Sequence, residues 1–289
     1  MRHAARLLAL VVGCAGVLCA CADPPAGQRI GATASSAPVS SAATTTGTEP
    51  RATRPPGSAA SAPPQNTRPG VPGPTITARP ARSTPLVDGQ ADEWVRHQEY
   101  AVATRVGGAP STRLTSAWRL AWDTRALYIF ADVTDPVVTQ THPLRPWLIG
   151  SGDSIGLELG RYTTNVRTDR LGSRDVRILI GPSESGATLR ARATPDGAEF
   201  GRGTTWTTGA AVVRRTRSGY AVEAAIPWEA LNVVSPKAGL RLSANLLLAD
   251  AVPTGADRGS LRTLMSHNPQ RVGAGIRSRF AWGVLTLGS

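Results

Sequence analysis

The stretch Leu127-Tyr128-Ile129-Phe130-Ala131-Asp132-Val133 alternates aliphatic side chains with aromatic or acidic ones, which is the period-two pattern of a β-strand. The same alternation recurs in residues 154–159 and 220–226. Further short runs of this kind are Val176–Ile180, Thr188–Ala193, Ala211–Arg215, Leu240–Leu248 and Arg279–Leu287. Pro227–Leu231 begins with proline and is the one segment predicted as a helical turn. The pattern therefore predicts an all-β domain, built as an antiparallel β-sandwich.

Aromatic residues divide the chain into two parts. All seven Trp, four Tyr and three Phe lie at or after Trp94, whereas residues 22–83 consist mainly of Ala, Pro, Ser, Thr and Gly. A segment without large apolar side chains cannot offset the entropy lost when its backbone is ordered. We therefore expect one folded domain, residues 84–289, behind a disordered linker, residues 22–83.

Residues 1–21 have the features of an export signal. Two arginines, Arg2 and Arg6, precede an apolar run that is too short for a comfortable membrane span. The run ends in Leu18-Cys19-Ala20-Cys21, which resembles the lipobox of bacterial lipoproteins and predicts lipid on Cys21. Cys14 is an alternative lipidated residue, and an ordinary signal peptide is a third possibility. We expect an exported protein, lipid-anchored on the extracytoplasmic side of a bacterial membrane or at the cell surface.

The cysteines and the charge exclude several kinds of site. All three cysteines lie in the signal, so the folded domain has no disulfide and no thiolate metal site. The chain has 32 basic and 20 acidic residues, a net charge of +12, and Lys237 is its one lysine. The arginines are dispersed along the sequence, which favours genomic codon usage as their cause and predicts no nucleic-acid partner. A basic patch for acidic glycans or nucleic acid is the alternative.

Six blocks of the folded part occur in the order found in one known family. The blocks are Leu86–Gly89 with Asp92–Trp94, Leu120–Asp123 with Ala126–Ile129 and Val133–Pro136, Gly152–Leu159, Gly219–Trp228, Asn245–Asp250, and Trp282–Leu287. In this order they resemble the family 9 carbohydrate-binding modules and their wider relatives, which include haem-binding cytochrome domains. The resemblance covers residues 85–289 and implies a jelly-roll-like β-sandwich.

The resemblance implies a saccharide site, but only some of the family's sugar-binding residues have a counterpart in this sequence. Family members that bind sugar hold a glycan end between two tryptophans, and Trp147 occupies the place of one of them. Arg177 matches an arginine that hydrogen-bonds sugar hydroxyls, and Asn245 is a further polar candidate. The family glutamate is replaced by Gly156, with Glu158 two residues along on the same strand face. No aromatic residue occurs in 272–279, where the second tryptophan is expected.

Calcium and haem are the cofactors to consider. Clustered carboxylates suit calcium, which the family often holds, and the candidates are Asp88, Asp92, Asp132, Asp135 and Asp153. Haem in some relatives is held by Met with Lys or His, for which this chain offers Met265 with Lys237 or His267. The tryptophans Trp94, Trp118, Trp122, Trp228 and Trp282 are expected to pack in the core.

No catalytic pattern emerges from the sequence. The histidines lie in no HExxH motif, and the Gly152-Asp153-Ser154 triplet lacks the Asp-x-x-His partner of the lipases it resembles. We therefore expect a non-catalytic, monomeric carbohydrate-binding lipoprotein of the cell envelope, with the glycan stacked on Trp147. The alternatives are a structural or protein-interaction sandwich that has lost sugar binding, a haem domain, and an accessory module in glycan degradation.

Overall fold

The computed structural model describes residues 74–108, 113–139, 146–162, 171–183, 186–196, 199–253, 259–268, 279 and 282–289. Its strands are β1 (Thr75–Pro80), β2 (Glu99–Val102), β3 (Thr104–Gly108), β4 (Thr115–Trp122), β5 (Ala126–Thr134), β6 (Ser154–Arg161), β7 (Val176–Pro182) and β8 (Thr188–Ala193). They continue with β9 (Pro195–Asp196), β10 (Glu199–Phe200), β11 (Thr204–Thr205), β12 (Ala210–Arg215), β13 (Gly219–Pro227), β14 (Arg241–Pro253), β15 (Gly259–Ser266) and β16 (Gly283–Leu287). Two 3₁₀ turns, η1 (Asp92–Trp94) and η2 (Pro146–Ser151), complete the described elements. No helix among them is long and apolar enough to cross a membrane.

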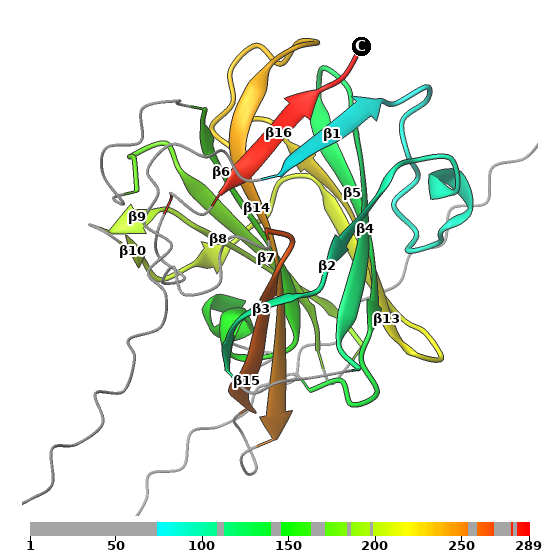
Figure 1. The fold of residues 1–289 in the computed structure, drawn as a ribbon, viewed down its shortest axis with the longest axis vertical. Coiled ribbons are helices and arrows are strands. Elements are labelled where there is room, and N and C mark those ends of the chain that lie inside the picture. Colours follow the sequence, from blue (N-terminus) through cyan, green and yellow to red (C-terminus); the bar gives the residue numbers. More distant parts are fainter. Residues whose placement is uncertain are drawn as a thin grey trace, which may run out of the picture. The chain divides into compact units, whose positions relative to one another are not determined.

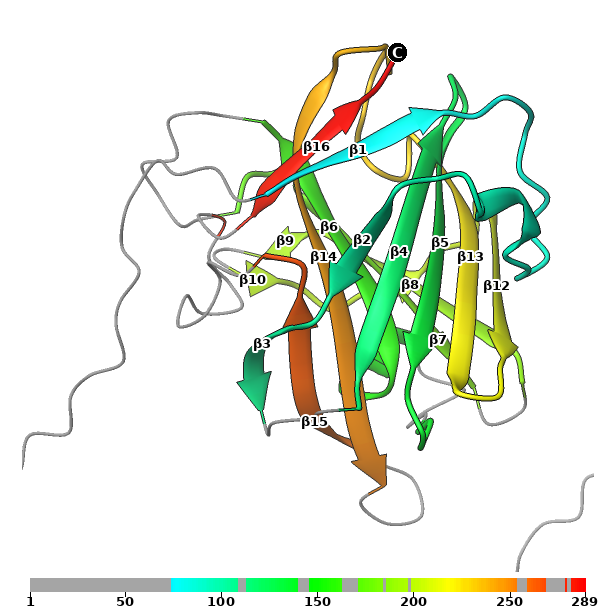
Figure 2. The same ribbon diagram turned by 45° about the vertical axis from the view of Figure 1, so that its right-hand side comes forward.

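Fourteen of these strands form one curled sheet whose two halves face each other as a sandwich, and β9 pairs with β10 in a separate two-stranded sheet. The order of the curled sheet is β11-β8-β7-β6-β14-β16-β1-β4-β5-β13-β12, with β15 and β3 continuing beside β14 and with β2 beside β4 (Figures 1 and 2). The pairings along this path are antiparallel except those of β1, which runs parallel to both β16 and β4. At the far ends, the Val213 amide of β12 donates a 2.8 Å hydrogen bond to Thr188 Oγ1 of β8. The predicted β-sandwich is therefore confirmed.

The main core lies between the two halves of the sheet. It joins Leu157 and Leu246 from one half to Leu120, Ile129 and Val222 from the other. The five tryptophans expected to pack in the core are all buried. Strand β5 is buried on both faces, because Tyr128 and Phe130 pack outward against Trp94 of η1 in a second cluster. This double burial explains why its sequence shows large apolar or aromatic side chains at nearly every position.

The loop that leads into η1 is fixed by one buried carboxylate. Glu223 Oε2 accepts hydrogen bonds from the amides of Asp88 at 2.9 Å and Gly89 at 2.7 Å, and Glu223 Oε1 accepts one from Trp94 Nε1 at 2.8 Å. Gly89 has φ +76°, a left-handed conformation that favours glycine. Two sequence blocks that are far apart, 86–94 and 219–228, are therefore joined at Glu223, which is a structural residue.

The predicted domain boundary at residue 84 is wrong. Strand β1, at residues 75–80, belongs to the fold, and its Ile76 and Ala78 side chains are buried in the main core. The strand was missed because it has no aromatic residue, follows Pro74 and ends in Pro80. The ordered domain begins at least ten residues earlier than the sequence indicated, since residue 74 is already described. Residues 1–73, with the predicted signal and most of the predicted linker, lie outside the described residues.

The predicted helical turn after Pro227 is a series of turns. The amides of Ala230, Leu231 and Asn232 donate to the carbonyls three residues earlier, at 2.9–3.1 Å. Trp228 Nε1 donates to the Asp123 carbonyl at 2.7 Å, which ties this segment to the β4–β5 turn.

Candidate functional site

Three of the four predicted saccharide residues meet on one face of the sheet. The register pairs Glu158 of β6 with Arg177 of β7 and with Asn245 of β14. Glu158 Oε1 accepts hydrogen bonds from Arg177 Nε at 3.1 Å and Nη2 at 2.5 Å, while Glu158 Oε2 accepts one from Asn245 Nδ2 at 2.7 Å. Ser266 Oγ donates to Asn245 Oδ1 at 2.7 Å and so fixes the orientation of that amide.

Burial gives these residues different roles. The side chains of Glu158 and Asn245 are inaccessible to solvent, whereas 21% of the Arg177 side chain is exposed. Arg177 Nη1 makes no hydrogen bond to the residues that the structure describes. Glu158, which is itself held by Asn245, therefore fixes the guanidinium group, and Arg177 is the member that a ligand can reach.

Aromatic rings and a second ion pair extend the network. The Arg177 guanidinium lies 4.4 Å from the centre of the half-buried Phe200 ring, and the Phe200 and Trp282 rings are parallel with centres 6.3 Å apart. Arg279 lies over Trp282 and contacts the buried Asp175 carboxylate at 3.5 Å. Burial raises the pKa of Asp175 and the negative charge of Glu158 raises it further, whereas the Gly172 amide and Arg279 oppose the rise. The site is thus an ionic network with two aromatic rings beside it, and Phe200 is an aromatic partner that the sequence did not predict.

The segment that carries Trp147 lies on the same face as Arg177. Ile149 of η2 packs with Leu179, which points to the same side of β7 as Arg177 because the two are two residues apart. The Trp147 side chain itself, and residues 272–278 of the range 272–279 where a second tryptophan was expected, lie outside the described residues. Trp147 as a ligand platform therefore stays a prediction.

The replacement of the family glutamate by Gly156 has a steric reason. A Cβ atom at Gly156 would lie 3.2 Å from both Leu179 Cδ2 and Leu247 Cβ, closer than side chains normally approach. Leucine side chains fill this part of the face, and the carboxylate is found two residues later, at Glu158.

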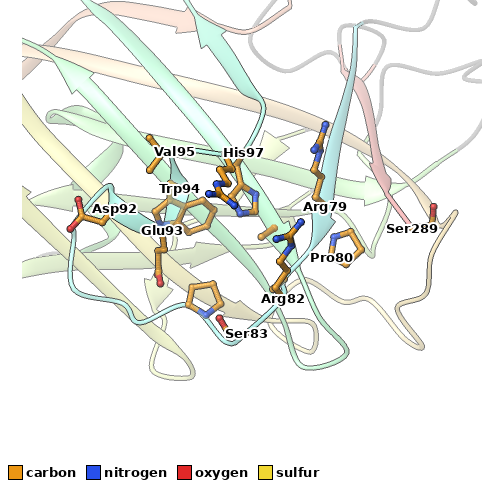
Figure 3. Close-up of a pocket in the computed structure, with 14 residues that line it drawn as sticks. Arg79, Pro80, Arg82, Ser83, Asp92, Glu93, Trp94, Val95, His97 and Ser289 are labelled. Carbon is orange, nitrogen blue, oxygen red and sulfur yellow. The ribbon is translucent and has the colours of Figure 1, made fainter.

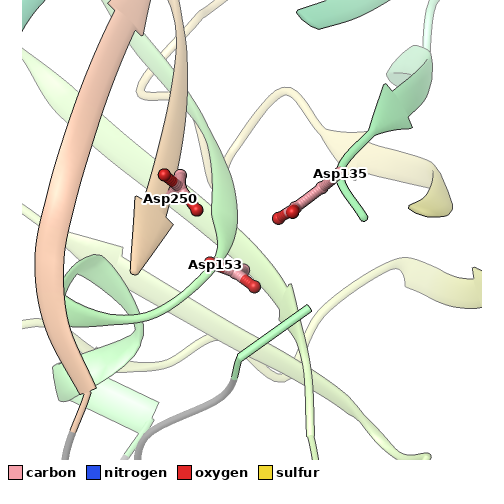
Figure 4. A group of neighbouring side chains, drawn as sticks. All are labelled: Asp135, Asp153 and Asp250. Atoms are coloured by element: carbon pink, nitrogen blue, oxygen red, sulfur yellow. The ribbon is translucent and has the colours of Figure 1, made fainter. Parts of the chain in front are cut away.

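A second cluster consists of three buried aspartates from separate segments. Asp135 follows β5, Asp153 precedes β6, and Asp250 lies within β14; one carboxylate oxygen from each falls within 4.8 Å of the others (Figure 4). Asp153 Oδ1 accepts a 2.7 Å hydrogen bond from the Ala251 amide, and its Oδ2 accepts one from the Thr139 amide. Each of the three residues is at least 98% buried. The two hydrogen bonds therefore fix the Asp153 carboxylate beside the other two.

The three carboxylates of this cluster repel one another, which favours a cation or a proton among them. Burial raises the pKa of Asp153 to about 8, and the charges of Asp135 and Asp250 raise it as well, against the two amide hydrogen bonds. The Tyr220 hydroxyl nearby is fully buried and has no hydrogen-bond partner among the described residues. Burial raises its pKa too, with smaller contributions from the same three carboxylates. Several buried negative charges are costly unless a cation pairs with them.

The predicted calcium residues are only partly brought together. Asp135 and Asp153 meet, and Asp250, which was not among the calcium candidates, joins them. Asp88, Asp92 and Asp132 are exposed and belong to no such cluster in the described residues. Asp88 instead accepts a 2.8 Å hydrogen bond from the Gln90 amide in its turn, which accounts for its presence. Asp88 and Asp92 therefore lie outside the cluster that Asp135 and Asp153 form with Asp250.

The residues considered for haem have structural explanations. Met265 packs in the main core, His267 Nδ1 accepts a 3.1 Å hydrogen bond from the Leu246 amide, and Lys237 is exposed.

Comparison with known sequences identifies a family. Residues 87–288 match the model of the family described as "Carbohydrate family 9 binding domain-like". The chain is 25% identical over 169 residues to endo-1,4-beta-xylanase A of Thermotoga neapolitana, covering 58% of this chain and 14% of the enzyme. It is also 25% identical over 193 residues to exoglucanase XynX of Acetivibrio thermocellus, covering 65% of this chain and 16% of that protein. The matches therefore span a small part of each relative.

Comparison with solved structures gives the same fold. A carbohydrate-binding module of family 9 from Caldicellulosiruptor kristjanssonii, solved in complex with cellotriose, has a TM-score of 0.56 at 18% identity and covers 75% of this chain and 94% of that one. A putative carbohydrate-binding protein from Bacteroides uniformis has a TM-score of 0.53 at 10% identity, covering 74% of this chain and 99% of that one.

Proposed function

We propose that this chain, which belongs to the carbohydrate family 9 binding domain-like family, binds a saccharide without transforming it. The observation that carries the proposal is the Glu158–Arg177–Asn245 network, in which the buried Glu158, held by Asn245, orients one accessible guanidinium group. An arginine held in this way presents its remaining donors at fixed positions, which suits the hydroxyl groups of a sugar. The binding role is consistent with the relatives, whose matched part is a small fraction of each enzyme.

Trp147 is proposed as the surface on which the sugar ring stacks. Its segment, η2, adjoins the face that carries Arg177, so a pyranose over the indole could also reach the guanidinium group. With a single stacked tryptophan and a buried glutamate, affinity is expected to be weak, with a dissociation constant in the millimolar range, or about −4 kcal/mol.

Replacing Trp147 by alanine should weaken binding of cellotriose by about 5- to 150-fold, because aromatic stacking contributes ~1–3 kcal/mol. Trp147→Phe should retain most of the affinity, since it keeps an aromatic face. The measurement is a calorimetric titration of the intact chain, with melting temperatures as the check on folding. Unchanged affinity of Trp147→Ala for cellotriose would show that the sugar binds elsewhere. If the wild type bound no saccharide at all, the alternative of a protein-interaction domain would be favoured.

A structural calcium ion is the second part of the proposal. Asp135, Asp153 and Asp250 would hold it, since hard oxygen ligands that converge within 4.8 Å match its preference. The ion would neutralise the buried carboxylates and join the end of β5, the start of β6 and the middle of β14. It would therefore stabilise the fold rather than contact the saccharide.

Calcium should raise the melting temperature of the wild type by about 5–10 °C over the same sample in EGTA. At a calcium concentration about 100 times the dissociation constant, binding to the folded state adds ~3 kcal/mol to the free energy of unfolding, which corresponds to this shift. Asp250→Asn should abolish this increase, because it removes a negative charge from the cluster. Asp132→Asn is the matched control and should keep it, because Asp132 is exposed on β5. An identical melting temperature with and without calcium in the wild type would refute the site.

Envelope anchoring is proposed on the sequence of residues 1–21 alone. Export followed by lipidation of Cys21 would tether the domain outside the cytoplasm, where polysaccharides are found.

A further inference from the structure

A groove with a cavity volume of about 810 Å³ lies at the other half of the sheet, between the end of β1 and the η1 segment (Figure 3). Its lining includes Arg79, Arg82, Arg96 and His97, with Trp94 beneath. None of the lining residues belongs to the Arg177 network or to the aspartate cluster. Its volume is in the range of small-molecule and oligosaccharide sites.

The groove has acidic residues, Asp92 and Glu93, at one end and arginines without an ion-pair partner among the described residues at the other. Arg79, Arg82 and Arg96 are exposed, and none of them makes an ion pair or side-chain hydrogen bond with the described residues. By contrast, the neighbouring Arg119 pairs with Glu99 at 2.5 Å. The guanidinium groups of Arg79 and Arg82 extend on one side of His97 and Trp94, whereas the carboxylates of Asp92 and Glu93 extend on the other (Figure 3).

His97 belongs to the lining of the same groove. Burial is the main reason that its pKa is lowered, and the charges of Arg79, Arg119 and Arg82 lower it further. His97 is therefore neutral at pH 7, and the local positive potential comes from the arginines. A site with unpaired guanidinium groups around a concave surface attracts anions, and the planar guanidinium group matches a carboxylate with two parallel hydrogen bonds.

We propose that this groove is a second binding site, and that it takes the carboxylate groups of an acidic polysaccharide through Arg79 and Arg82. The choice of a polysaccharide rests on the proposed function, whereas the preference for an anion rests on the groove itself. The net charge of +12 of the chain favours approach of such a polymer from solution. A glycan that presents uronate residues could contact this groove independently of the Arg177 face.

The test compares two double variants of the full chain that remove the same charge. Arg79→Gln/Arg82→Gln alters the groove, and Arg113→Gln/Arg217→Gln is the matched control, since both control arginines are exposed and outside the lining. The probe is polygalacturonate, with dextran as the neutral polymer, measured by affinity electrophoresis at 50 mM and 500 mM NaCl. We expect the wild type to bind polygalacturonate but not dextran. Its affinity for polygalacturonate should fall at least tenfold in the groove variant and at 500 mM NaCl, and should change less than twofold in the control variant.

Cellotriose titrations of the same variants separate this proposal from the proposed function. The groove variant should bind cellotriose as the wild type does, whatever the strength of that binding. Equal weakening of polygalacturonate binding in both double variants would show a nonspecific charge effect and overturn the proposal. The proposal would also be overturned if the wild type did not bind polygalacturonate, or if the groove variant bound it as the wild type does.

Discussion

A fragment that begins at residue 84 should melt about 10 °C or more below one that begins at residue 74, because it lacks β1. We expect the loss of β1 to lower the free energy of unfolding by ~4 kcal/mol, which corresponds to this shift in a domain of this size. The lost contributions are the buried Ile76 side chain and main-chain hydrogen bonds on both sides of the strand. Among them are those from the Ala81 amide to the Trp122 carbonyl at 2.8 Å and from the Gly288 amide to the Ala78 carbonyl at 2.8 Å. The measurement is differential scanning calorimetry of the two fragments beside the intact chain.

A substitution in the intact chain isolates the same effect. Ile76→Ala should lower the free energy of unfolding by about 2–4 kcal/mol, the usual range for a buried isoleucine. Thr75→Ala, at an exposed position of the same strand, should change it by less than ~0.5 kcal/mol. If the fragment starting at 84 melts within about 2 °C of the longer one, β1 contributes little and the domain does begin where the sequence indicated.

Strand β1 shows why the fold could be predicted but its limit could not. The strands with long apolar alternation, such as β5, β6 and β13, are evident in the sequence because their pattern is set by burial along the whole strand. In β1 only Ile76 and Ala78 are buried. They become so because β16 and β4, which are distant in sequence, lie on either side of them. Burial that depends on such distant partners leaves little trace in local composition.

The candidate site was predictable where the family pattern applied. Arg177, Glu158 and Asn245 were named from the resemblance, and the strand register places them side by side. Phe200 was not predicted, because it lies in a strand of two residues that has no recognisable period. Asp250 lies inside the long strand β14, where a buried charge has no explanation until Asp135 and Asp153 are seen beside it.

Replacing Arg177 is expected to have the largest effect on saccharide binding. Arg177→Ala removes the accessible donors and the ion pair with the buried Glu158 carboxylate, so it should both abolish detectable binding and destabilise the fold. Arg177→Lys keeps a positive charge near Glu158 but loses the planar pair of donors. We expect this variant to fold and to bind at least tenfold more weakly than the wild type. Arg113→Lys, at an exposed position outside the network, is the control.

Isothermal titration of the intact chain with cellotriose, run in parallel on the wild type, Arg177→Lys and Arg113→Lys, tests the central claim most directly. The account predicts a dissociation constant of about 1 mM, or −4 kcal/mol, for the wild type and for Arg113→Lys. It predicts a value at least ten times larger for Arg177→Lys, with an unchanged melting temperature. Wild-type affinity in a folded Arg177→Lys protein would contradict the assignment of the saccharide site to the Glu158–Arg177–Asn245 network.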